Sequence, residues 1–203
     1  CPGLAALKSI PNATCSEGFG QIQKVIFQRL RQDNGKPNAF TTEKPITKLA
    51  NLTPLLAAND STKIVVSPYL QAPSAEPGAA RKFGGGNDTL GGIEITIGRE
   101  PTAFTCVIRN APQSQIKAMK YLSCETDVQN LGVFLVNEDG AIGAIKDAKG
   151  AVTPIPIFNL FISDKGFGGF ENPDSNNVSW SFLPNWSDDF AIITPEDYNP
   201  LTD

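Results

Sequence analysis

Apolar and polar positions alternate along much of the second half of the chain, which predicts short β-strands. Residues 93–97 place isoleucine at every second position, and residues 102–109 place Phe104, Cys106 and Ile108 on one face. A two-residue period is typical of a strand with one buried face. We therefore predict a half-buried strand in each segment, with residues 98–101 closing a hairpin between them.

Other apolar runs predict more strands. Residues 131–136 are apolar on both faces, which indicates a central strand. Pro154 and Pro156 place the start of the strand expected at 155–164 at a sheet edge, because proline has no backbone N–H to donate to a ladder. Counting from the N-terminus, the remaining expected strands are 21–30, 61–68, 141–145, 155–164, 178–183 and 189–195.

The period changes to three residues between positions 110 and 125. Ile116, Met119 and Leu122 recur there, and Asn110 is suited to cap a helix whose first turn contains Pro112. A shorter helix is expected to start at Pro54, with Thr53 as its cap. The chain is therefore predicted to be α+β and mostly β, an antiparallel β-sandwich or barrel with one flanking α-helix.

The division of the chain follows from its irregular segments. We expect a single domain over residues 1–203, with an N-terminal arm (1–20), a β-rich body (21–194) and a C-terminal tail (195–203). Residues 69–92 are rich in glycine and proline and are predicted to be a long loop within the body. Within the body, Trp180 and Phe104 are predicted to be core residues, whereas Trp186 is the better candidate for an exposed ligand contact.

Composition argues against an enzyme. The chain has no histidine, which excludes Ser-His-Asp and Cys-His catalysis. The glycine-rich runs 83–92 and 166–170 lack the lysine and the following helix of a phosphate loop. Carboxylates cluster at residues 188–189 and 196–197, where solvated surface charge is expected. We predict no catalytic residues, no cofactor and no metal, and no apolar run is long enough for a membrane span.

The four cysteines leave several interpretations open. Cys106 lies in an apolar run and is expected to be a buried thiol, and pairings of Cys1 with Cys15 and of Cys106 with Cys124 are both possible. Cys1 could be a lipid-anchored residue, half of a disulfide or a plain thiol. We interpret it as a plain thiol on an interface arm, with all four thiols free.

An arm, a long loop and a tail around one β-rich body are typical of subunits that reach their neighbours. This order of elements resembles the tail tube proteins of bacteriophages and of contractile injection machines. The resemblance implies hexameric rings that stack into a tube, with other tail proteins as partners and DNA passing through without specific binding. It also implies a virion tail assembled in the host cytoplasm, with no membrane partner.

A net charge of −4 is compatible with a conduit that does not attract DNA. The alternative is a bacterial surface lipoprotein or a secreted carbohydrate- or ligand-binding domain. In that case Cys1 would be acylated, Trp186 would contact the ligand, and the protein would lie on the bacterial outer surface.

Overall fold

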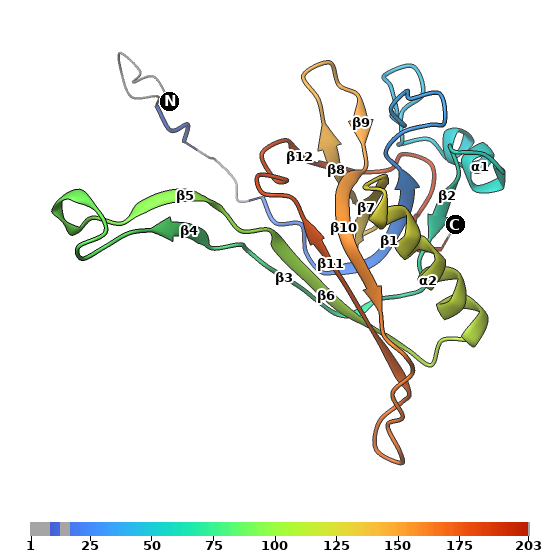
Figure 1. The fold of residues 1–203 in the computed structure, drawn as a ribbon. Helices are drawn as coiled ribbons and strands as arrows, with labels where there is room; N and C mark the ends of the chain where they lie inside the picture. The colour runs from blue at the N-terminus through green and yellow to red at the C-terminus, as the bar shows by residue number, and fades with distance from the viewer. Residues whose placement is uncertain (1–8, 13–16, 203) are drawn as a thin grey trace.

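A computed structural model of the protein describes residues 9–12 and 17–202, and antiparallel strands dominate it (Figure 1). The main sheet contains β1 (Ile22–Arg29), β2 (Ile64–Val66), β3 (Gln71–Glu76), β6 (Thr102–Arg109), β7 (Leu131–Asn137), β8 (Ile142–Lys146), β9 (Val152–Thr153), β10 (Ile155–Ile162), β11 (Ser175–Phe182) and β12 (Phe190–Ile193). The other elements are the paired strands β4 (Ala80–Phe83) and β5 (Ile95–Arg99), the helices α1 (Leu49–Ala57) and α2 (Gln113–Asp127), and the 3-10 turn η1 (Leu90–Gly92). The predicted fold class is confirmed.

Six strands wrap around one hydrophobic interior, in the order β1, β7, β10, β11, β6 and β3, and each pairs with the next in antiparallel fashion. These six strands form a wall, which closes where the chain passes from β2 to β3. The backbone N–H groups of Ser67 and Leu70 donate there to the carbonyls of Val25 and Gln23, at 2.9 and 2.7 Å. The sheet therefore approaches a closed barrel, which leaves few strand edges unpaired.

Aromatic side chains fill this interior. Trp180 is 1% exposed and stacks on Phe104, with the ring centroids 4.2 Å apart. Phe27 and Phe182 meet the same indole edge-on. The predictions that Trp180 and Phe104 are core residues are confirmed.

Strand β7 separates this interior from a second hydrophobic core. All of its residues are buried. Leu131, Val133 and Leu135 belong to the interior, whereas Phe134 and Val136 belong to the second core, which also contains residues of α1 and of the C-terminal tail. The predicted central strand is confirmed.

The C-terminal tail is attached to the body through Glu196 and Asp197. The Nζ atom of Lys48 lies 2.9 Å from a carboxylate oxygen of Glu196, and Asp197 accepts a hydrogen bond from the N–H of Leu49 at 2.8 Å. Asp197 thus caps α1 from across the fold. The helix begins at Leu49 instead of Pro54, because a cap supplied by a distant segment leaves no local pattern in the sequence.

Two other local predictions are corrected. Strand β10 is not at an edge, because it lies between β7 and β11, and Pro156 is placed opposite Gly132. The ladder between β10 and β7 covers only two residue pairs, so the backbone N–H that Pro156 lacks removes little from the pairing. Helix α2 begins at Gln113, which makes Pro112 its cap residue. Asn110 is therefore not the cap, and no side chain at the cap position bonds to the helix.

The cysteine predictions are tested in part. Cys106 is buried and free, and burial raises the pKa of its thiol to about 12. Cys124 is exposed and free, so the Cys106–Cys124 pairing does not form. Cys1, Cys15 and much of the N-terminal arm lie outside the described residues.

Substitution of Trp180 by alanine is expected to lower the free energy of unfolding by about 3–5 kcal/mol, because it empties the centre of the interior. Urea denaturation measures the loss. Trp180→Phe is the matched control: it keeps a ring in the stack and removes the indole N–H, which has no partner among the described residues. A loss below about 1 kcal/mol for Trp180→Ala would contradict the assignment of this residue to the core.

The attachment of the tail is expected to weaken in acid. Hydrogen bonds from Lys48 and from the Thr47 hydroxyl hold the pKa of Glu196 below its ordinary value. A depressed carboxylate pKa contributes stability above the ordinary pKa of about 4.3, and the contribution is lost as pH falls through the folded-state pKa. Glu196→Gln should therefore flatten the dependence of unfolding free energy on pH below about 5. Glu43→Gln, at an exposed carboxylate without a salt bridge to a described residue, is the matched control, and equal pH profiles of the two variants would contradict the role of Glu196.

Candidate assembly interface

A two-stranded ribbon (residues 79–100) projects from the body, as Figure 1 shows on the left in green. It is made of β4 and β5 and continues the paired strands β3 and β6 outward. The prediction of an irregular loop over residues 69–92 is therefore wrong, as is that of a hairpin turn at 98–101. Residues 98–101 lie opposite the start of β4, and the N–H of Glu100 donates to the carbonyl of Ala79 at 2.8 Å.

The ribbon is amphipathic across its two faces. Phe83 pairs directly with Ile95, so these two side chains share one face of the ribbon. The ladder shifts register between Arg81 and Lys82, which leaves Ile97 without a paired residue, and Ile93 precedes the strand. The three isoleucines are 69, 54 and 66% exposed in chain order. The predicted alternation is correct, but the expected burial is wrong, because no other part of the described chain covers this face.

Polar side chains occupy the opposite face of the ribbon. Lys82 lies across from Thr96 and forms an ion pair with Glu94 at 2.9 Å. This face is therefore suited to water, whereas the isoleucine face is not. A two-stranded ribbon by itself is marginally stable in water, so its apolar face favours contact with another surface.

Glycine shapes both ends of the ribbon. At the base, a Cβ atom on Gly78 would lie 2.0 Å from the carbonyl oxygen of Glu100, so only glycine allows the two strands to meet there. At the tip, Gly84, Gly85 and Gly86 all adopt positive φ, which glycine does without strain. The tip then presents Leu90, which is 99% exposed.

A second apolar projection lies at the turn between β10 and β11, at the bottom of Figure 1. Phe167 and Phe170 are both almost fully exposed there. Reciprocal backbone hydrogen bonds between Gly166 and Ser175 hold the base of this turn. The two projections point in different directions from the body.

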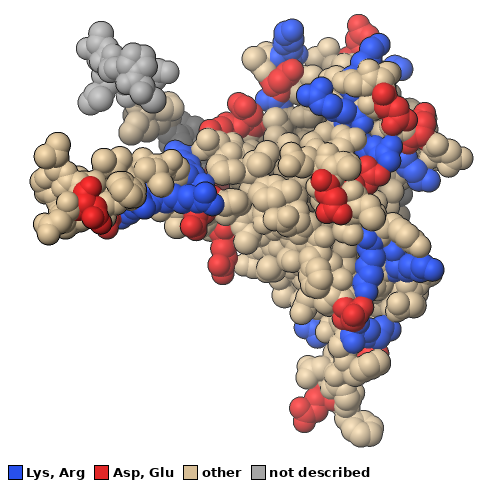
Figure 2. Space-filling view, in the orientation of Figure 1, with Lys and Arg blue, Asp and Glu red and all other residues tan. Residues whose placement is uncertain are grey.

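Charge does not form a single basic surface on the face drawn in Figure 2. Lysines, arginines and carboxylates intermingle over the body, and cations lie along the ribbon. The charges of the ribbon balance: its three cations are Arg81, Lys82 and Arg99, and its three carboxylates are Asp88, Glu94 and Glu100.

A groove on the other side of the body separates β2 from α2. It consists of two cavities of about 450 and 550 Å³, which meet at Val65 and Leu122. β2 pairs with β1 alone, so its outer edge carries no ladder within the described chain. The apolar part of the lining also includes Phe27, Val66, Ala118, Met119 and Leu131.

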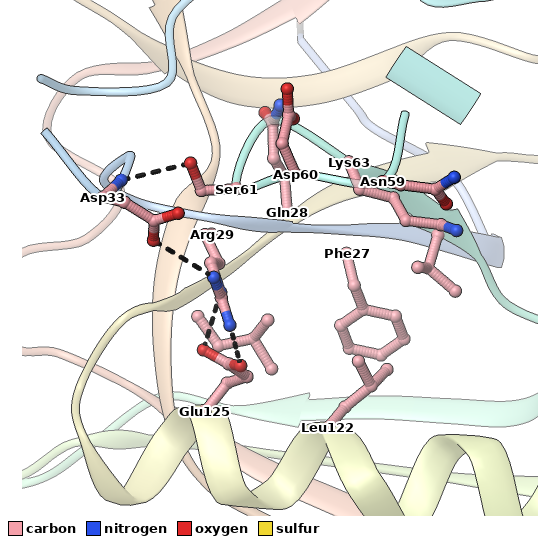
Figure 3. A pocket seen from close by; sticks show the side chains of 12 residues that line it. Phe27, Gln28, Arg29, Asp33, Asn59, Asp60, Ser61, Lys63, Leu122 and Glu125 are labelled. Carbon is pink, nitrogen blue, oxygen red and sulfur yellow. Dashed lines mark hydrogen bonds and ion pairs between the residues drawn. The ribbon is translucent and has the colours of Figure 1, made fainter. Parts of the chain in front are cut away.

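Polar groups surround the first cavity (Figure 3). Arg29 binds Glu125 of α2 through two hydrogen bonds of 2.9 and 2.5 Å, and it reaches Asp33 at 3.5 Å. The hydrogen bond from Thr62 lowers the pKa of Asp60, so this carboxylate stays charged at neutral pH. Three carboxylates and two cations line this cavity, which gives it a net negative charge.

One buried acceptor without a partner lies on the face of β1 away from the groove (Figure 3). The side-chain amide of Gln28, which is 3% exposed, donates to the carbonyl of Thr62 at 2.9 Å. Its oxygen has no hydrogen-bond partner among the described residues. A buried polar atom without a partner costs stability.

The sequence did not reveal the groove, because its walls come from segments about 60 residues apart. The candidate ligand contact Trp186 is half-buried and stacks on Phe182, with ring centroids 4.5 Å apart, so its prediction as an exposed platform is corrected. Asp188 and Asp189 are exposed. Glu196 and Asp197 are exposed as well, and they also anchor the tail through Lys48 and the N–H of Leu49.

Within residues 9–12 and 17–202, no three metal-ligating side chains gather closely enough to hold an ion. Over the same part of the chain, no helix has the length and hydropathy that crossing a membrane requires.

No protein-family model matches the chain, and no curated protein matches it. A solved structure with partial likeness is a chain of the anti-feeding prophage (AFP) baseplate, determined by cryo-EM and 6-fold symmetrised. The TM-score is 0.36 at 8% sequence identity, over 90% of this chain and 99% of that chain. This is a loose structural similarity to a baseplate chain, and the tail tube family expected from the order of elements stays a prediction.

Substitution of Gly78 by alanine is expected to open the base of the ribbon and leave the body intact, because the added methyl group meets the backbone of Glu100. Hydrogen exchange of the Glu100 amide should accelerate about tenfold or more, whereas exchange in β11 should not change. Gly98→Ala is the matched control, since a Cβ atom there meets nothing within 4 Å. Equal exchange in the two variants would contradict the close approach.

Proposed function

We propose that the protein is a structural subunit that assembles with copies of itself into hexameric rings, and that these rings stack into a tail-type tube. The observation that carries the proposal is the unpartnered apolar face of the ribbon. A soluble monomer gains nothing from holding Ile93, Ile95 and Ile97 in water. A subunit that buries this face against a neighbour gains the free energy of their transfer from water.

The apolar turn between β10 and β11 supports the same proposal. Phe167 and Phe170 add another exposed apolar tip, directed away from the ribbon. Two projections with different directions suit a subunit that contacts neighbours both within a ring and between rings. Other tail components are then the expected partners at the two ends of the stack, and the protein belongs to a virion tail assembled in the host cytoplasm.

Charge fits a conduit for DNA. The chain carries a net charge of −4, so its overall field repels the phosphate backbone instead of retaining it. DNA would pass through the tube without specific contacts. No catalytic role is part of the proposal.

The surface lipoprotein or ligand-binding alternative has less support. Its candidate contact, Trp186, belongs to an aromatic stack with Phe182 and Phe190 and is held there instead of facing solvent. Its other requirement, an acylated Cys1, falls on a residue outside the described ones, and the intact mass of the protein tests it.

Replacement of Ile95 by aspartate is expected to abolish ring formation, because it places a charge in the centre of the apolar face. Burial of one isoleucine contributes about 1.5–3 kcal/mol. The loss should therefore raise the concentration for half assembly by roughly ten- to a hundredfold. Light scattering after size-exclusion chromatography and negative-stain electron microscopy measure assembly.

Thr96→Asp is the matched control, since it adds the same charge at the next position on the polar face, opposite Lys82. It should assemble like the natural chain. Monomers of the natural chain at every concentration, without rings or tubes, would contradict the proposed function.

A further inference from the structure

We propose that a cavity between β1, the loop that follows it and α1 is a binding site for an N-acylated amino acid, either a free molecule or the carboxyl-terminal residue of a peptide. Such a ligand carries a carboxylate, a neighbouring amide N–H and an apolar side chain. The cavity has a volume of about 270 Å³ and lies on the other face of β1 from the groove described above. The inference goes beyond the proposed function and does not depend on it.

Hydrogen bonds within the chain fix the walls of this cavity. Asn38 and Phe40 both line it. The side-chain amide of Asn38 donates to the carbonyls of Arg29 and Ser61, at 2.9 and 2.8 Å. Phe40 exchanges two backbone hydrogen bonds of 2.8 Å with Val152. Walls that are already ordered lose less conformational entropy when a ligand binds.

Gln28 gives the cavity an acceptor that lacks a donor. Its side chain lies on the face of β1 opposite Phe27 and Arg29 (Figure 3), and Gln28 lines the cavity together with Thr62. The Nε2 atom of Gln28 donates to the carbonyl of Thr62, whereas its Oε1 atom has no partner among the described residues. Because Gln28 is 3% exposed, the unpartnered oxygen costs stability that an amide N–H of a ligand would recover.

Charge selects the other end of the ligand. Among the described residues that line the cavity, Lys44 is the only cation and none is a carboxylate. Lys44 is exposed and forms no ion pair with a described residue. A carboxylate beside this ammonium is favoured, whereas a second ammonium is disfavoured. The amino group of the ligand is therefore acylated and neutral.

The apolar part of the lining fits the side chain of such a ligand. Phe40 is buried at the cavity, and α1 adds Pro54 and Leu55. Pockets for drug-sized ligands occupy about 300–1,000 Å³, so this smaller cavity holds roughly one amino-acid residue. A peptide would insert only its last residue and leave the rest of its chain in solvent.

The test titrates N-acetyl-L-leucine with the full chain and measures its affinity by saturation-transfer NMR on the ligand, which does not require a monomeric protein. Two matched molecules each lack one group. N-acetyl-L-leucinamide has no carboxylate and should bind about tenfold or more weakly. 4-Methylpentanoate has no amide N–H and should bind about threefold or more weakly.

A tripeptide with the same last residue, N-acetyl-alanyl-alanyl-leucine, distinguishes the two sources of the ligand. Binding at least as tight as that of N-acetyl-L-leucine supports a site for peptide ends. Weaker binding supports a site for the free acid.

Variants test each side chain. Lys44→Gln should remove the preference for N-acetyl-L-leucine over its amide, and Gln28→Leu should remove the preference over 4-methylpentanoate. Lys36→Gln is the control for the first, at an exposed lysine of the same loop outside the lining. Ala50→Leu should fill the cavity and abolish binding. Ala57→Leu, at an exposed position of the same helix outside the lining, should bind like the natural chain.

Absence of binding, or equal binding by the natural chain and by Ala50→Leu, would overturn the inference and leave the proposed function standing. Equal affinities of the natural chain for N-acetyl-L-leucine and 4-methylpentanoate would also overturn it, since the Gln28 oxygen would then bind only water. That comparison needs no variant, so it decides even if Gln28→Leu is unstable. A chain that binds as expected and never assembles would overturn the proposed function alone.

Discussion

The burial of β7 on both faces is the constraint on which the rest of the structure depends. Alternate residues of this strand supply the aromatic interior and the second core, so neither can form without it. A strand buried on both sides admits no shift in register, because a shift of one residue would exchange the two apolar sets. The two cores are thereby fixed relative to each other, and the tail and α1 are fixed with the second.

The ribbon follows from the same arrangement. The six strands of the wall and α2 already fill the interior, where Trp180 is stacked between aromatic neighbours. No room remains there for the side chains of β4 and β5, so these strands continue outward along the line of β3 and β6. Ile93, Ile95 and Ile97 are thus exposed, and no other part of the described chain covers them.

The sequence predicts the body well because its signals are local. The alternation at 102–109, the doubly apolar run of β7 and the three-residue period of α2 each define an element without knowledge of its neighbours. Prediction from the sequence fails where an element depends on a residue that is distant along the chain. Asp197 caps a helix 148 residues earlier, and the glycines of 78–92 conceal strands whose pairing needs close backbone approach. The groove lies between β2 and α2, which no pattern in the sequence connects.

The base of the ribbon has a role beyond holding two strands together. If copies join through the ribbon as proposed, the angle at which it leaves the body decides whether they close into a ring or continue as a filament. That angle is set where the backbone at Gly78 passes against Glu100, since a flexible base would allow many angles and no defined closure. The residue that allows the close backbone contact at the base is therefore also the one that holds the direction of the ribbon.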